Sequence, residues 1–394
     1  MEQNTLFYLA LILFSGLILG RAVKLIRLPN VTGYLIAGLI IGPYGFRLIS
    51  ANMVGDLELI SEMALAFIAF TIGSEFKLSY IKRVGMMPIV IAIFEGLTAS
   101  VLVTLALVLA GVDIEIALLL GAIASATAPA ATVMVIKQYR TKGPVTETLL
   151  SVVALDDAVA LILFGFASAI VTAMSSPGTA SLTMTIVYSI LEIVGSCAVG
   201  FLLGFLFTLP LRYFKKSSNR LIILTGFIFL GAALANMMGL SPLLLCMCIG
   251  AMLVNGSPDA MEVFKLTDSV TPPIFLMFFV VSGMNLNLTI LPQIGLIGMI
   301  YIVVRVIGKI SGAYIGSRLM KAPSVVRKYL GLSLIPQAGV AIGLALITAR
   351  ILPQYAETIQ AVILGATFIY ELIGPVTTKV SLQKAGEIPD QERA

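Results

Sequence analysis

The sequence predicts an all-α polytopic membrane protein with about thirteen transmembrane helices. Hydrophobic residues make up 59% of the 394 residues, whereas charged residues make up only 11%. Soluble domains carry about 25% charged residues, so a soluble fold could not hide this much apolar surface. Apolar runs long enough to cross a bilayer recur from end to end. The predicted spans are 5–24, 30–46, 56–76, 84–111, 115–138, 144–174, 181–212, 220–239, 241–256, 268–288, 293–318, 325–350 and 357–380.

The basic residues between these spans predict the orientation of the protein, because cytoplasmic loops are enriched in lysine and arginine. If the N-terminus lies outside, nearly all basic residues of the loops and of the C-terminal tail fall on the cytoplasmic side. Only Arg47 and Arg350 fall on the other side. The expected location is the plasma (inner) membrane, with the N-terminus outside and the C-terminus in the cytoplasm. The first span lacks a cleavage site and is expected to be retained.

The composition also excludes several kinds of chemistry. The sequence contains no histidine, and its three cysteines, Cys197, Cys246 and Cys248, lie in apolar segments where they are interpreted as packing residues. Proton chemistry must therefore use carboxylates, lysine or tyrosine. The net charge of +5 comes from the loops and does not indicate nucleic-acid binding. We expect no cofactor and no enzymatic activity; the bilayer and small ions are the expected partners.

Charged side chains within the predicted spans are the first candidates for function, because inserting each one into the membrane costs free energy. Asp156 and Asp157 lie in the middle of span 144–174. Adjacent residues of a helix point about 100° apart, so the two carboxylates can face different neighbours. One could pair with a basic residue, while a cation and a proton compete for the other. Such competition is the minimum that an antiporter needs.

Arg305 and Lys309 lie in span 293–318 and share one face of the helix, because they are four residues apart. One of them is expected to balance Asp156 and the other a different carboxylate, and the sequence alone leaves this assignment open. The roles of the remaining carboxylates in predicted spans are also open; these are Glu62, Glu95, Glu192 and Glu371.

Two of the predicted spans contain a proline near the centre. Pro129 follows Thr127 in one of them, and Pro336 precedes Gln337 in the other. Proline breaks the helix, and the freed backbone groups must find partners in protein or water. Paired breaks of this kind are typical of the ion sites of secondary transporters.

Two inverted repeats of six spans each would place the two breaks in corresponding positions. The repeats are predicted at about 30–212 and 220–380. In the same scheme span 144–174, which carries the aspartates, corresponds to span 357–380. Span 293–318, which carries Arg305 and Lys309, corresponds to span 84–111. Gly308, Gly312 and Gly316 follow each other at four-residue spacing and are interpreted as a stripe for close helix packing.

Taken in order, the motifs resemble the monovalent cation:proton antiporter superfamily, and the adjacent aspartates are similar to its NhaA/NapA-like sodium/proton antiporters. The motifs are Thr127–Ala128–Pro129, the segment ALDDAVAL, the segment RVIGK and the segment IPQAGVAIG. The resemblance covers nearly the whole chain and implies two crossing discontinuous helices. It also implies a core ion-transport domain, at about 56–174 and 268–380, and a dimerisation scaffold that makes the protein a homodimer.

The resemblance implies roles for single residues as well. Asp157 would be the main carrier of the cation and the proton, and Asp156 would pair with Arg305, with Lys309 as the alternative. Thr127 would supply oxygen ligands, so Na⁺ is expected at Asp157, Asp156 and Thr127. The implied function is electrogenic exchange of Na⁺ or Li⁺ for protons by alternating access, in the service of pH homeostasis.

Departures from the family pattern keep two alternatives open. Arg305 is similar to electroneutral members, whereas Asp156 is similar to electrogenic ones. Potassium-efflux relatives carry a soluble nucleotide-binding domain, and no such regulatory domain is expected here, yet K⁺/H⁺ antiport stays an alternative. Sodium-coupled symport of an organic solute is the other. An intramembrane aspartyl protease is disfavoured because its aspartates come from different helices, and no filter motif indicates a channel.

Overall fold

The computed structural model describes residues 5–25, 30–79, 82, 85–128, 132–133, 135–136, 139–174, 182–285 and 295–389. Among these residues, eight helices are long and apolar enough to cross a membrane, and two helices bent by 51° form a ninth span if counted together. Every predicted span contains helix, although three of the apolar helices have only 10–17 residues. The all-α membrane fold is confirmed, while the count of thirteen spans stays a prediction.

The chain divides into two compact units, each made of three segments. Unit 1 contains Met1–Ala22, Gly33–Ile81 and Thr172–Asn285. Unit 2 contains Val23–Thr32, Lys82–Val171 and Leu286–Ala394. The predicted inverted repeats and the predicted division into core and dimerisation helices stay predictions.

Unit 1 packs its helices through small residues. Helix α12 contacts both α4 and α10. A Cβ atom added to Gly73 or Gly250 would lie 2.2 or 2.1 Å from a carbonyl oxygen of the facing helix, so the backbones of α4 and α12 touch. The helices of this unit are α1 (Thr5–Lys24), most of α2 (Asn30–Ile41), α3 (Ala51–Asp56), α4 (Glu58–Gly73), η1 (Ser74–Phe76), α10 (Leu182–Tyr213), α11 (Ser217–Met238), α12 (Pro242–Gly256) and α13 (Ala260–Met284).

Helix α13 differs from its predicted span, which began at residue 268. The helix begins at Ala260, and its first turns carry Glu262, Lys265 and Asp268. The span was predicted from apolar composition, so its predicted start excluded Glu262 and Lys265. The helix therefore extends beyond its apolar part.

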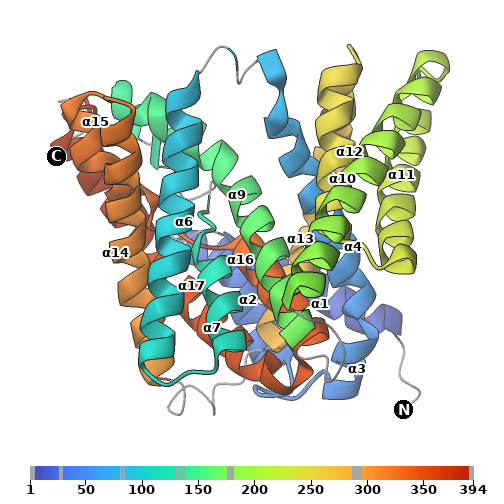
Figure 1. Cartoon of the computed structure of the whole chain (residues 1–394). Helices are drawn as coiled ribbons and strands as arrows, with labels where there is room; N and C mark the ends of the chain where they lie inside the picture. Colours follow the sequence, from blue (N-terminus) through green and yellow to red (C-terminus); the bar gives the residue numbers. More distant parts are fainter. Residues whose placement is uncertain are drawn as a thin grey trace. The chain divides into compact units, whose positions relative to one another are not determined.

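Unit 2 is organised around the contact between α6 and α14, which run side by side (Figure 1). A Cβ atom added to any of three α14 glycines would lie within 2.9 Å of an α6 Cα atom, so the predicted glycine stripe is a packing surface. The facing pairs are Gly308 with Ala99, Gly312 with Glu95 and Gly316 with Ile91. The helices of this unit are α6 (Met86–Leu109), α7 (Ile114–Ala124), α9 (Pro144–Met174), α14 (Gly295–Leu319), α15 (Ser324–Tyr329), η3 (Leu330–Leu334), α16 (Gly339–Ile351), η4 (Pro353–Tyr355) and α17 (Ala356–Lys384).

Both predicted breaks lie in unit 2. Helix α7 ends at Ala124, and residues 125–128 continue without helical structure. Pro129 itself lies outside the described residues. In the second broken span, residues 335–338 separate η3 from α16, as the position of Pro336 predicted. Each break leaves backbone groups that need partners away from their own helix.

Candidate ion-binding site

The two broken spans meet at their non-helical segments. The backbone N–H of Ala128 donates a hydrogen bond of 2.9 Å to the carbonyl oxygen of Pro336. The hydroxyl of Thr127 donates to the carbonyl oxygen of Leu334 at 3.4 Å. Part of the backbone that one break frees is thus satisfied by the other break. The expected crossing of two discontinuous helices is present.

Arg305 satisfies further carbonyl groups at this crossing. Its side chain extends from α14 and donates to the carbonyl oxygens of Ala124 at 2.9 Å, Ala126 at 2.7 Å and Ile335 at 2.7 Å. The guanidinium carbon lies 4.6 Å from the ring centroid of Tyr370, and the Arg305 side chain is fully buried. A planar group with five donors can bridge several carbonyls at once. Arg305 therefore holds the ends of both broken helices together.

Gln337 and Tyr301 extend this network. The side-chain amide of Gln337 donates to the carbonyl oxygen of Ile123 at 2.9 Å. Its amide oxygen lies 3.1 Å from the hydroxyl of Tyr301, one helical turn before Arg305 on α14. The structure thus places the predicted residue Gln337 at the crossing. Sequence reasoning missed Tyr301, although its spacing of four residues from Arg305 was a usable signal.

Lys309 is the centre of a buried ion-pair cluster. Its ammonium nitrogen lies 3.0 Å from Oδ2 of Asp156 and 2.7 Å from Oε2 of Glu95. All three side chains are 0% exposed. Lys309 also donates to the hydroxyl of Thr127 at 2.8 Å and to the carbonyl oxygen of Ser125. One ammonium group therefore joins the first break to two carboxylates from α9 and α6.

This arrangement corrects the pairing that the family resemblance implied. Arg305 does not pair with Asp156; Lys309 does. The two basic residues share a face of α14, but Arg305 lies one turn, about 6 Å along the helix axis, before Lys309. At this position its side chain reaches the backbone carbonyl groups of the two breaks. The planar guanidinium can donate hydrogen bonds to several carbonyl oxygens at once, whereas the compact ammonium group pairs with carboxylates. One helical turn thus decides which cation meets the aspartate.

Asp157 follows Asp156 on α9 and is also buried, with 7% of its surface exposed. The structure therefore brings Asp156, Thr127 and Lys309 into direct contact and places Asp157 beside them on the same helix. The roles of these residues in binding an ion or a proton stay a prediction. Glu95, whose role the sequence left open, belongs to the cluster because α6 and α14 approach closely at Gly312.

The other carboxylates of the predicted spans lie in different surroundings. In unit 2, Glu371 on α17 is buried and accepts a hydrogen bond from the hydroxyl of Thr32. In unit 1, Glu62 accepts a hydrogen bond from the side chain of Asn236. Glu192 lies on α10 and is half-buried. No described basic side chain forms an ion pair with Glu371 or Glu192.

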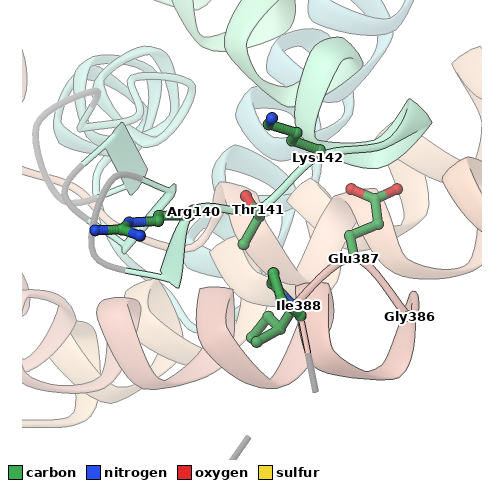
Figure 2. Close-up of a pocket in the computed structure, with 7 residues that line it drawn as sticks. Arg140, Thr141, Lys142, Gly386, Glu387 and Ile388 are labelled. Atoms are coloured by element: carbon green, nitrogen blue, oxygen red, sulfur yellow. The ribbon is translucent and has the colours of Figure 1, made fainter. Parts of the chain in front are cut away.

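The C-terminal segment contacts the start of α9, the helix that carries both aspartates. Figure 2 shows Glu387 of this segment in a pocket that Thr141 and Lys142, just before α9, also line. The Glu387 carboxylate accepts hydrogen bonds from the backbone N–H of Val145 at 2.7 Å, and from the N–H and hydroxyl of Thr146 at 2.8 and 2.7 Å. The backbone N–H of Lys142 donates to the carbonyl oxygen of Glu387. The start of a helix attracts negative charge, so this carboxylate acts as a cap. The sequence contained no signal for it, because Glu387 follows the last predicted span.

The chain is similar to several known proteins. A family model described as sodium/hydrogen exchanger, transmembrane, matches residues 9–384. The chain is 25% identical over 415 residues to the glutathione-regulated potassium-efflux system protein KefC of Enterobacter sp., covering all of this chain but only 63% of that protein's length. It is 24% identical over 386 residues to a Na⁺/H⁺ antiporter of Enterococcus hirae, covering 94% of this chain and 97% of that one.

A solved structure confirms the fold. The sodium proton antiporter MjNhaP1 of Methanocaldococcus jannaschii superposes with a TM-score of 0.78 over 98% of both chains, at 19% identity. At this identity the match shows the fold alone. The family match, in contrast, covers almost the whole sequence and includes the crossing and the aspartates. The chain therefore belongs to the sodium/hydrogen exchanger family of transmembrane transport proteins.

Proposed function

We propose that the protein exchanges a monovalent cation for protons by alternating access, with Asp157 and Asp156 as the carriers. The observation that supports this proposal best is the charge balance of five buried side chains, those of the Lys309 cluster together with Asp157 and Arg305. Glu95, Asp156 and Asp157 provide three carboxylates, whereas Arg305 and Lys309 provide two cations. If all five groups were charged, one negative charge would be left inside the membrane, where it is costly. Binding one cation or one proton removes that charge.

Competition for the same carboxylates couples the two fluxes. A proton on Asp157 removes the charge that attracts the cation, and a bound cation disfavours the proton. Lys309 adds a second coupling, because a cation that binds Asp156 must displace the ammonium group. Glu95 keeps that ammonium paired, since it already lies 2.7 Å from Lys309. In the structure the Thr127 hydroxyl accepts a hydrogen bond from Lys309. When the ammonium group is displaced, this hydroxyl oxygen becomes free to bind the cation.

Na⁺, with Li⁺ as a second substrate, is our first choice of cation. The similarity to the Na⁺/H⁺ antiporter of Enterococcus hirae, whose length is almost fully covered, supports Na⁺. The match to the potassium-efflux protein favours K⁺ as the second candidate. We propose electrogenic exchange, because Asp156 can take up a second proton while Lys309 stays paired with Glu95, so that two protons can be carried against one monovalent cation.

We further propose that the protein acts in pH homeostasis as a homodimer in the plasma (inner) membrane. The placement of basic residues in the loops supports an N-terminus outside and a cytoplasmic C-terminus. Support for the homodimer comes from the family resemblance alone.

The test is proton exchange in liposomes that contain the purified protein and a pH-sensitive dye. A proton gradient is imposed, and Na⁺, Li⁺, K⁺ or choline is then added. We expect Na⁺ and Li⁺, but not choline, to dissipate the gradient. Asp157→Asn should abolish the response, because an amide can neither carry a proton nor supply negative charge. Clamping the membrane potential should change the rate if exchange is electrogenic.

Glu192→Gln is the matched control, because it removes a carboxylate from a helix of unit 1 outside the cluster. We expect this variant to exchange ions at the normal rate. If K⁺ alone dissipates the gradient, the second candidate replaces Na⁺. If no cation moves protons through a correctly folded protein, antiport is excluded and the buried charges serve another process.

A further inference from the structure

A cavity of about 700 Å³ opens in unit 2 between α14 and the short helices α15 and η3. One wall is a stripe on α14 formed by Ile307, Ile310, Ser311 and Tyr314. Residues spaced by three and four positions lie on one face of a helix, and this stripe extends about 10 Å along the axis. Ile307 is 54% exposed and Tyr314 is 45% exposed, so the wall is open to the surroundings. In a bilayer these surroundings are lipid.

The floor of the cavity is the contact between α14 and η3. A Cβ atom added to Gly331 would lie 2.7 Å from the Cα atom of Ile310, so the two backbones touch there. The cavity is therefore a groove with an apolar side and a closed base. A groove of this form fits the upper part of an acyl chain.

The rim of the groove is cationic, and no counter-ion for it is found among the residues that the structure describes. Arg327 and Lys328 of α15 line it together with Ser324. The sequence contains no acidic residue between Asp268 and Glu357, and neither cation forms an ion pair with a described residue. In addition, Nε of Arg327 is buried and makes no hydrogen bond with any described group. A buried guanidinium N–H without a protein acceptor is a donor that an anionic ligand can use.

We propose that this groove binds an anionic phospholipid, with its phosphate on Arg327 and Lys328 and an acyl chain along the α14 stripe. Arginine donates two parallel hydrogen bonds to phosphate, and lysine adds a second positive charge. Basic pockets between membrane helices on the cytoplasmic side are known to bind anionic head groups. The proposed orientation places this end of α14 on that side. The proposal requires a bilayer and does not depend on which ion is transported.

The test is lipid retention by the whole purified protein, measured by native mass spectrometry. Dioleoyl phosphatidylglycerol is added to delipidated protein, with dioleoyl phosphatidylcholine as the uncharged reference. We expect one phosphatidylglycerol to be retained in preference to phosphatidylcholine. The double variant Arg327→Gln/Lys328→Gln should weaken this retention about tenfold or more, because both phosphate contacts are lost.

Arg318→Gln/Lys321→Gln is the matched control, because it removes the same charge next to the same groove from residues that do not line it. This variant should retain phosphatidylglycerol as the wild type does. Equal losses in both double variants, or no loss in either, would overturn the site. If Arg327→Gln prevents folding, Lys328→Glu on the exposed residue gives the same comparison through charge reversal.

A second arm distinguishes a lipid from a soluble phosphate compound. Glycerol 1-phosphate, which carries the head-group phosphate without acyl chains, is added in large excess. We expect it to leave phosphatidylglycerol bound, because the α14 stripe contributes to lipid binding. Ile307→Asn should weaken lipid retention without changing the charge. Displacement of phosphatidylglycerol by this excess of glycerol 1-phosphate would overturn the lipid assignment in favour of a soluble anion.

Discussion

The described residues of each unit include a cluster of opposite charges, and the two clusters differ in their access to water. In unit 1, Asp259 lies 2.6 Å from Arg220 and 2.9 Å from Lys215, whose side chain is 62% exposed. In unit 2, Lys309 and both of its carboxylate partners are 0% exposed. Water and salt screen the Lys215–Asp259 pair, which contributes little to stability, whereas Arg220 of the same cluster is only 4% exposed. In the second cluster no water replaces a lost partner, so charge pairing is obligatory and any imbalance must be met by an ion or a proton.

Removing one cation from each cluster, the buried Lys309 or the exposed Lys215, should show the largest difference. Lys309→Met leaves Asp156 and Glu95 as buried carboxylates without their cation and should lower the free energy of unfolding by about 3–5 kcal/mol. Lys215→Met should lower it by no more than about 1 kcal/mol. Denaturant titration in detergent micelles measures both changes.

The double variant Lys309→Met/Asp156→Asn should recover part of the lost stability, because it also removes one of the unpaired negative charges. Equal losses for Lys309→Met and Lys215→Met would show that the buried cluster is screened like the exposed one. That result would also remove the charge-balance argument for ion exchange.

Separating α6 from α14 tests whether close packing holds the buried cluster together. Gly312→Val should lower the free energy of unfolding by about 1–3 kcal/mol, because its Cβ would lie 2.6 Å from the Cα of Glu95. Gly298→Ala on the same helix is the control, since no heavy atom lies within 4 Å of its added Cβ. The control should be neutral or stabilising by up to about 1 kcal/mol. A neutral Gly312→Val would contradict the packing.

The Glu387 cap should contribute less than either of these features. Glu387→Gln keeps the shape of the side chain but removes its charge, and caps contribute about 0.5–2 kcal/mol. Glu147→Gln is the control, because Glu147 is exposed in the first turn of the same helix. We expect Glu387→Gln to lower the melting temperature more, and to raise the Na⁺ concentration needed for half-maximal exchange. No difference between the two variants would show that the cap does not position α9.

The smallest effect is expected in the exposed cluster of unit 1 at low pH. The hydrogen bond from Lys215, with the charges of Arg220 and Lys215, lowers the pKa of Asp259 below its usual value. The resulting stability is present above the usual carboxyl pKa of about 3.9 and is lost as the pH falls through the lowered pKa. Below about pH 4 the wild type should therefore lose melting temperature faster than Asp259→Asn. Identical curves would show that the pairing does not persist in solution.

The sequence predicted the fold well because a membrane leaves few alternatives to packed helices. It located Asp156, Lys309, Thr127 and Gln337 because charged and polar residues are rare in apolar spans and a proline interrupts two of them. The sequence did not show whether Arg305 or Lys309 pairs with Asp156. The answer depends on how far α14 is shifted along its axis relative to the two breaks. This shift is set by backbone contact between the α14 glycines and α6, and no local sequence pattern predicts it.

Other parts of the site depend on contacts between distant segments. Glu95 joins the cluster because α6 packs on α14, and Glu387 caps α9 because the chain turns back after α17. Sequence spacing within one helix contains no information about either contact. A prediction would have needed the pairing of helices as well as their positions in the chain.

Arg305 has a consequence for ion selectivity. Its guanidinium already occupies carbonyl oxygens from both broken helices, so these weak dipolar ligands are not available to a transported ion. The remaining ligands are mainly carboxylates, whose electric field at short range is much stronger than that of a carbonyl. A strong field favours the ion with the smallest radius, because its closest approach to the charge gains more than its dehydration costs. We therefore expect the affinity to decrease from Li⁺ through Na⁺ to K⁺. The guanidinium of Arg305 causes this order, because it keeps the weaker carbonyl ligands away from the ion.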